Sequence, residues 1–134
     1  MQLLKVQQQQ LHDIGQRHGL TFLVLHGSAA TDKAKPGDVD IAYLTRGNDN
    51  LRLLLQLQES LEPLFPGMKL DIGSLATASP LFRVRATGKG VLLFGDQREF
   101  QRYKVKALME HCDSESFYAL QARLREKKLA YLGV

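Results

Sequence analysis

Two short motifs in the first third of the chain carry groups suited to phosphate chemistry. Gly27 and Ser28 close an apolar segment, and nine residues separate them from Asp38, with Asp40 one residue further on. Successive side chains of a strand point to opposite faces, so Asp38 and Asp40 are expected to share a face. Two carboxylates held this close repel each other unless a cation neutralises them. Because Mg²⁺ prefers oxygen ligands and is usually shared between carboxylates and substrate phosphates, the pattern predicts a site for metal-chelated triphosphate.

A third acid strengthens this prediction. Asp71 stands between Leu70 and Ile72 in a short apolar run that is typical of a strand. A carboxylate in apolar surroundings is costly unless a cation or hydrogen bonds compensate its charge. If this strand lies beside the strand of Asp38, three carboxylates converge. Such a cluster can hold a pair of metal ions roughly 3.5–4 Å apart.

These motifs resemble those of nucleotidyltransferases of the DNA polymerase beta type, and more narrowly the minimal nucleotidyltransferases (MNT), antitoxins encoded beside HEPN-domain RNase toxins. Gly27 and Ser28 match the turn of that family, Asp38 and Asp40 match its metal-binding pair, and Asp71 matches its third acid. Residues 75–81 and 87–94 resemble the helix and final strand that follow this acid. Two departures are a spacer of nine residues, where ten is commoner, and the segment 29–31, which lacks the arginine often found there.

The resemblance implies an antitoxin of a type VII-like pair that transfers AMP from ATP to a tyrosine of a cognate HEPN toxin and so inactivates it. Mg²⁺ is the implied cofactor and ATP the substrate. Asp38, Asp40 and Asp71 would be the catalytic and metal-binding acids, and Gly27 and Ser28 would bind the nucleotide. The alternative is a binding-only antitoxin that occludes its toxin. Transfer to a small molecule or an RNA end is a third possibility, which the chain length disfavours.

Chain length limits the number of domains, and net charge limits the kinds of partner. The 134 residues suffice for one domain, expected to span 1–134, and leave no room for an acceptor-binding domain, so a separate molecule is expected to present the acceptor. The net charge is +4, with the basic excess mostly after residue 80. A basic surface could meet an acidic protein, a triphosphate or nucleic acid, or could simply be solvated. Zinc-finger and aromatic RNA-stacking motifs are absent, so we do not expect direct nucleic-acid binding.

Cysteine content and hydropathy indicate the compartment. Cys112 is the single cysteine, which excludes a disulfide within the chain and favours a reducing compartment. The N-terminal residues lead into a run of glutamines, Gln7 to Gln10, and not into an apolar signal core. No segment approaches the roughly 20 apolar residues that span a membrane. We therefore expect a cytoplasmic protein without membrane contact.

Hydrophobic periodicity and turn residues predict the elements. The expected strands are 20–26, 39–44, a short strand around Asp71, and 91–94, and the expected helices are a first helix ending at Gly19, then 50–64, 79–87, 97–109 and 114–132. Residues 29–37 are expected to form a short helix or loop. The first helix is expected to bury Leu3, Leu4, Leu11 and Ile14. Alternating strands and helices predict an α/β sheet covered by helices. The resemblance refines this to a polymerase-beta-like α+β fold, with a small mixed sheet of about four strands and a helical C-terminus.

Other chemical residues are weaker candidates. Lys33, Lys35 and Lys89 could contact the triphosphate, although each alone could equally be a solvated side chain. His26 could contact the nucleotide or simply complete its strand. Gly88 to Gly90 do not form a P-loop, because a strand follows them where a helix would be needed. The chain also lacks the Gly-x-Ser-x-Gly motif of a serine hydrolase.

Overall fold

The computed structural model describes residues 3–30, 37–131 and 133. In chain order the elements are α1 (Lys5–Arg17), β1 (Leu20–His26), the 3₁₀ turn η1 (Gly27–Ala30), β2 (Asp38–Thr45), α2 (Leu51–Leu61), the 3₁₀ turn η2 (Glu62–Leu64), β3 (Lys69–Ser74), α3 (Pro80–Gly88), β4 (Val91–Phe94) and α4 (Gln97–Tyr131). Every predicted strand is present, within one residue at each end where bounds were predicted. Within the described ranges, no helix is both long and apolar enough to cross a membrane.

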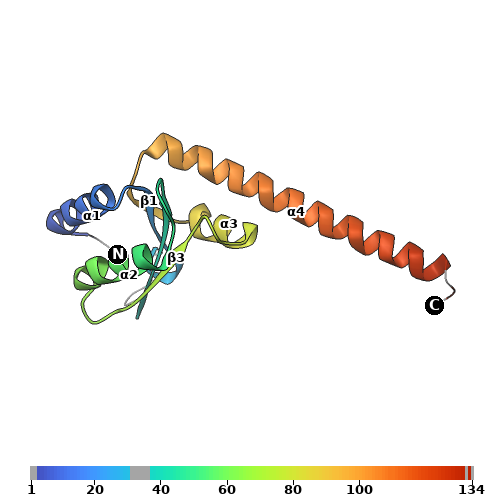
Figure 1. Cartoon of the computed structure of the whole chain (residues 1–134), viewed down its shortest axis with the longest axis horizontal. Coiled ribbons are helices and arrows are strands. Elements are labelled where there is room, and N and C mark those ends of the chain that lie inside the picture. Colours follow the sequence, from blue (N-terminus) through green and yellow to red (C-terminus); the bar gives the residue numbers. More distant parts are fainter. Residues whose placement is uncertain (1–2, 31–36, 132, 134) are drawn as a thin grey trace.

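The four strands form one mixed sheet in the order β3-β2-β1-β4. β1 is antiparallel to β2 and β4, and β2 is parallel to β3. Figure 1 labels β1 and β3 of this sheet. β1 is central and almost continuously buried, as its apolar sequence predicts. The parallel pair needs a long crossover connection, which α2 supplies. The predicted mixed sheet of about four strands is confirmed.

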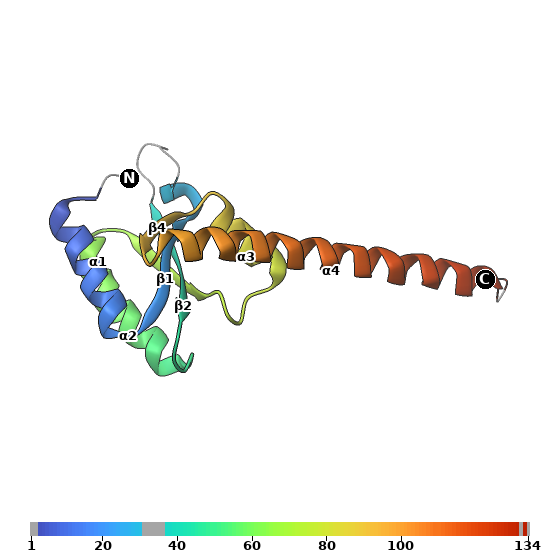
Figure 2. The same cartoon turned by 90° about the horizontal axis from the view of Figure 1, so that it is seen from above.

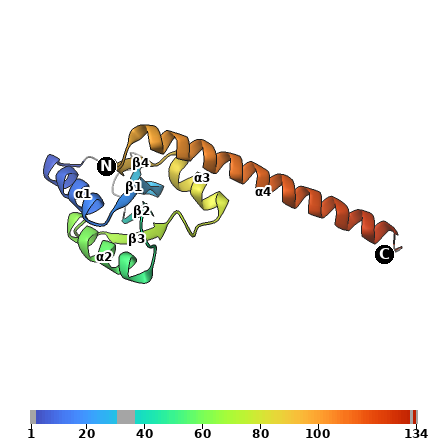
Figure 3. The ribbon, with the colours of Figure 1, turned by 45° about the horizontal axis from the view of Figure 1, so that its top comes forward.

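Helices cover both faces of the sheet, and each face has its own core. α1 and α2 pack on one face, where Leu11 and Leu57 meet residues such as Ile41 of β2. α3 and the first turns of α4 pack on the other face, where Ala86 and Phe100 meet β1 (Figure 3). The side chains of each strand alternate between these two cores.

The first helix buries Leu11 and Ile14 as predicted, but the prediction for Leu4 is wrong. The helix begins at Lys5, so Leu4 is its N-cap and is 71% exposed, while Leu3 is half-buried against the core. Gly15 is buried instead. It packs so closely on the ring of Phe94 that a side chain there would overlap the ring. Close packing of α1 on β4 therefore depends on a glycine that the hydrophobic pattern does not single out.

The later helices follow the prediction except that α2 ends at Leu61, with the 3₁₀ turn η2 in place of its last predicted residues, and that α4 is longer. Asn50 caps α2 by accepting a hydrogen bond of 2.9 Å from the backbone amide of Leu53. The two predicted C-terminal segments are one continuous helix, Gln97–Tyr131. Because no Gly or Pro stands between Met109 and Ser114, nothing in the sequence forces the helix to end there. The distal half of α4 projects away from the rest of the protein (Figures 1 and 2).

Candidate active site

The three predicted acids lie on one face of the sheet, on the neighbouring strands β2 and β3. In the parallel pairing, Asp40 is the direct partner of Asp71, and Asp38 precedes Asp40 by two residues. Strand alternation places all three on the face that α3 covers, because Ala42, two residues after Asp40, belongs to the α3 core. Asp38 and Asp71 are exposed and Asp40 is half-buried. Asp71 therefore does not have the apolar surroundings that its sequence neighbours suggest.

The turn after β1 lies directly against Asp40. His26, the last residue of β1, pairs with Asp40 across the antiparallel ladder. Gly27 follows with a φ of +71°, and a Cβ added there would overlap the Asp40 carboxylate. A glycine is required on both counts, by the left-handed backbone and by the close approach. Ser28 continues into η1 with an exposed side chain, so the predicted turn and the predicted acids are brought together.

An aromatic side chain that the sequence analysis did not select borders this site. Phe82 of α3 meets His26 edge to face, with ring centroids 5.6 Å apart. A Cβ at Gly73, two residues after Asp71, would come within 3.4 Å of the Phe82 ring. Burial lowers the pKa of His26, and the negative charge of Asp40 opposes this shift. No local pattern could have identified Phe82, because its position depends on how α3 packs across the sheet.

The carboxylates are not gathered into a ready-made ion site. Among the described residues, no three His, Cys, Asp or Glu side chains stand close enough together to hold one metal ion. The three acids nevertheless offer carboxylate oxygens, which suit a hard divalent cation. Of the weaker candidates, Lys33 and Lys35 lie outside the described residues. Lys89 is the exposed C-cap of α3.

A second polar cluster stands at the other end of β2. Tyr43 donates a hydrogen bond of 2.7 Å to Asp49, which also accepts one from the Ser74 hydroxyl. Burial, reinforced by the hydrogen bond to Asp49 and by its charge, raises the pKa of Tyr43 to about 12. The cluster joins β2 and β3 to the segment that leads into α2, so its role is structural. Asp49 precedes the N-cap Asn50, the one local signal that could have marked it.

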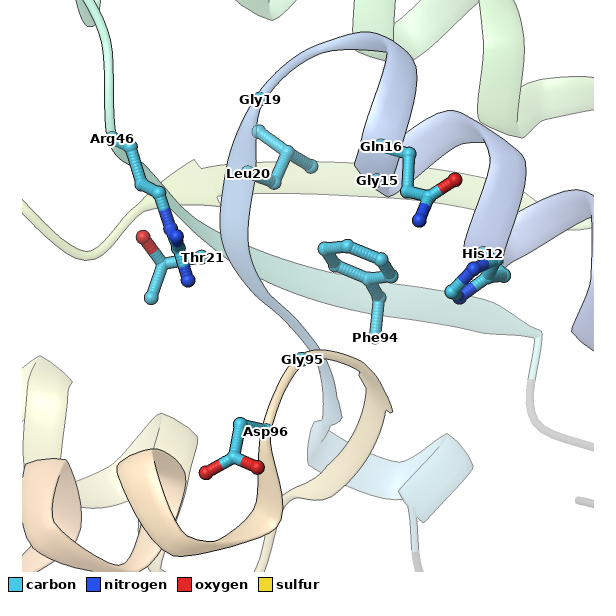
Figure 4. Close-up of a pocket in the computed structure, with 10 residues that line it drawn as sticks. All are labelled: His12, Gly15, Gln16, Gly19, Leu20, Thr21, Arg46, Phe94, Gly95 and Asp96. Atoms are coloured by element: carbon cyan, nitrogen blue, oxygen red, sulfur yellow. The ribbon is translucent and has the colours of Figure 1, made fainter.

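A cavity of about 580 Å³ lies at the opposite end of β1 from Gly27 (Figure 4). The Phe94 ring lies within it, 5.5 Å from the ring of His12. Two of its charged residues already have structural partners. Arg46 approaches Glu99 at 3.6 Å, and Asp96 accepts a hydrogen bond of 2.9 Å from the backbone amide of Glu99 at the start of α4. Because it lies at the opposite end of β1, this cavity is separate from the site of the three acids.

Comparison with known families identifies the class of protein. The model of the family described as polymerase beta, nucleotidyltransferase matches residues 9–99, which include the Gly27-Ser28 turn and all three acids. The chain belongs to this nucleotidyltransferase family. No curated protein matches this nucleotidyltransferase chain.

Solved structures share the same fold at low sequence identity. A mutant of the toxin-antitoxin MntA-HpeT is 17% identical with a TM-score of 0.66, over 87% of this chain and 98% of that one. A toxin-antitoxin structure with AMP-PNP is 19% identical with a TM-score of 0.63, over 87% of this chain and 98% of that one. A tri-AMPylated Shewanella oneidensis HEPN toxin in complex with MNT antitoxin is 19% identical with a TM-score of 0.63, over 90% of this chain and 98% of that one. The fold resemblance to structures of MNT-HEPN pairs is therefore confirmed.

Proposed function

We propose that this nucleotidyltransferase is an antitoxin that moves AMP from ATP to a tyrosine hydroxyl of a HEPN-domain RNase toxin and so inactivates it. The observation that carries the proposal is the in-register pair of Asp40 and Asp71 on adjacent parallel strands, with the Gly27 turn packed against Asp40. Membership of the nucleotidyltransferase family supports the reaction class.

The metal-binding part of the proposal assigns Mg²⁺ to Asp38, Asp40 and Asp71. These side chains offer only oxygen ligands, which Mg²⁺ prefers. Asp38 and Asp71 are exposed, so rotation about their Cα–Cβ bonds can bring their carboxylates toward Asp40. When bound, the ion neutralises the charge of the triphosphate and polarises the reacting phosphate.

The residues of the chain have distinct roles in the proposed reaction. Because Gly27 has no side chain, the turn can approach the triphosphate, and the hydroxyl and amide of Ser28 hold it. The hydroxyl oxygen of the acceptor attacks the α-phosphorus, and Asp71 accepts the proton that this hydroxyl loses. The bond from this phosphorus to the oxygen that bridges to the β-phosphate breaks, and pyrophosphate leaves with that electron pair. Positioning and charge neutralisation supply most of the acceleration.

The proposed partner and substrate are supported by the similar structures. One of them contains AMP-PNP, and another contains an AMPylated HEPN toxin beside an MNT antitoxin. A protein hydroxyl as acceptor also agrees with the exposed position of Asp38 and Asp71, which leaves their side chains accessible to a docked macromolecule.

A binding-only antitoxin is the second candidate. One observation favours it: no three acidic or metal-ligating side chains of the described residues are gathered for an ion. In that case the acids would be structural remnants, and the protein would act by covering the RNase site of its toxin. The two candidates differ in stoichiometry, because an enzyme turns over and an occluding protein does not.

The labelling test uses the purified chain, a HEPN protein encoded beside it, Mg²⁺, and ATP labelled at the α- or γ-phosphate. We expect label from the α-phosphate on the HEPN protein and none from the γ-phosphate. The Asp38→Asn, Asp40→Asn double variant should lose transfer. The matched control Asp13→Asn changes an exposed acid on α1 and should keep it. Label from the γ-phosphate would indicate a kinase and overturn the proposal.

The dose test separates the two candidates. Residual RNase activity of the toxin is measured against the amount of antitoxin, with and without ATP. We expect substoichiometric wild-type protein to silence the toxin only when ATP is present. If the double variant protects equally well and ATP makes no difference, the binding-only candidate replaces the enzymatic one.

A further inference from the structure

Helix α4 extends far beyond the core that it covers. Its first turns pack on the sheet and on α3, where Arg83 contacts Glu110 at 3.0 Å. From Cys112 to Tyr131, every side chain that the structure describes is exposed. At 1.5 Å per residue the 35-residue helix is about 52 Å long, and its distal half projects outward (Figure 2). The family match ends at residue 99, so nearly all of α4 lies outside it.

One face of the exposed part carries a stripe, defined here as Met109, Asp113, Leu120, Leu124, Lys127 and Tyr131. Their spacings of three, four and seven residues place them on one side of an α-helix. The four apolar members are between 46% and 91% exposed. Leu129 is also exposed but lies on the opposite side of the helix. Because most of the stability of a helix in a protein comes from packing of one face, burial of the stripe would stabilise this segment.

The charges along this segment are balanced and segregated. Residues 110–131 contain four acidic and four basic residues. Three of the acidic ones precede residue 116, and all four basic ones follow residue 122. A second copy running in the opposite direction would bring the acidic end of each helix against the basic end of the other. A strongly acidic or basic partner would be complementary to only one half.

We propose that the stripe of α4 pairs antiparallel with the same stripe of a second copy, about a two-fold axis at Leu120. Met109 and Tyr131 are each eleven residues from Leu120, so they face each other across the pair. Asp113 and Lys127 are each seven residues from it, so they form two symmetry-related ion pairs. The interface is isologous, and its closed symmetry limits the assembly to a dimer. This inference does not depend on nucleotidyl transfer.

The first experiment measures the mass of the full chain in solution by analytical ultracentrifugation over a range of concentrations. We expect a concentration-dependent dimer. Leu120→Asp combined with Leu124→Asp should raise the dimer dissociation constant at least about 100-fold, because four apolar side chains per dimer lose their burial. Leu129→Asp, on the opposite side of the helix, is the matched control and should leave the dimer intact. Circular dichroism checks that each variant is folded.

A charge exchange tests the direction of the pairing. Asp113→Lys and Lys127→Asp should each weaken the dimer about fivefold or more, since each creates two like-charge contacts. The double exchange should restore wild-type affinity, because it recreates both ion pairs with their signs reversed. A chain that stays monomeric at all concentrations would overturn the proposal, as would a dimer that the Leu120 and Leu124 changes do not weaken. If the chain is monomeric and the same two changes abolish toxin binding, the stripe is a heterologous docking surface instead.

Discussion

Gly27 is the residue on which the geometry of the turn and the acids depends most directly. Its φ of +71° and its contact with the Asp40 carboxylate leave no room for a side chain. We expect Gly27→Ala to lower the free energy of unfolding by roughly 1–3 kcal/mol and to weaken Mg²⁺-ATP binding, because Asp40 must move. Urea denaturation and titration calorimetry measure the two effects.

The matched control for this change is Gly67→Ala. Gly67 has a φ of +75°, but apart from its two chain neighbours no residue comes within 4 Å of the position that its Cβ would take. It should therefore cost less stability than Gly27→Ala, because only the backbone strain contributes, and it should leave ATP binding unchanged. Equal ATP affinities for the two variants would contradict the role assigned to the contact between Gly27 and Asp40.

The raised pKa of Tyr43 sets how the stability of the protein is expected to change at alkaline pH. Its pKa is raised from 10.0 to about 12 in the folded protein, so the folded state holds the phenol proton more tightly than the unfolded chain. This contribution is fully present below pH 10.0 and is lost as the pH rises to about 12. We expect the wild-type free energy of unfolding to fall more steeply over this window than that of Tyr43→Phe, as measured by urea denaturation at each pH. Parallel curves would show that Tyr43 is not responsible.

At the level of elements, Arg83 of α3 connects this helix to the segment after β3 and to α4. Its guanidinium donates to the carbonyls of Leu75 and Ala76 at 2.8 and 2.9 Å and contacts Glu110 at 3.0 Å. We expect Arg83→Ala to cost about 2 kcal/mol of stability and to increase hydrogen exchange in the first turns of α4. Arg85→Ala removes an exposed arginine of the same helix and should change neither. Exchange that is no faster in Arg83→Ala would show that the apolar core alone holds α4.

For the molecule as a whole, the three acids predict linkage between ligand binding and folding. A ligand that binds only the folded state stabilises it by about 2.7 kcal/mol at 100 times its dissociation constant. We therefore expect Mg²⁺ with ATP to raise the melting temperature more than either alone. The Asp38→Asn, Asp40→Asn variant should lose this gain, and its metal-free form should melt no lower than wild type because a repulsion is removed. No ATP binding by calorimetry in the presence of Mg²⁺ would contradict the site.

Much of this protein follows from local sequence alone. The apolar run of β1, the Asn50 cap of α2 and the spacing of Asp38 and Asp40 each depend on residues a few positions apart, and the corresponding strands and helix stand close to where they were predicted. The family resemblance also follows from these short motifs. Whether the acids bind metal and nucleotide stays a prediction, since their carboxylates are not gathered among the described residues.

Contacts between distant segments decided the rest. The register that makes Asp40 the partner of Asp71, the position of Phe82 beside His26 and the contact of Gly27 with Asp40 join residues from different elements. Periodicity records which residues of one element share a face, but not which other element covers that face. The exposure of Leu4 and the continuity of α4 were missed for the same reason, because packing and helix continuation compete through free energies that a local pattern does not contain.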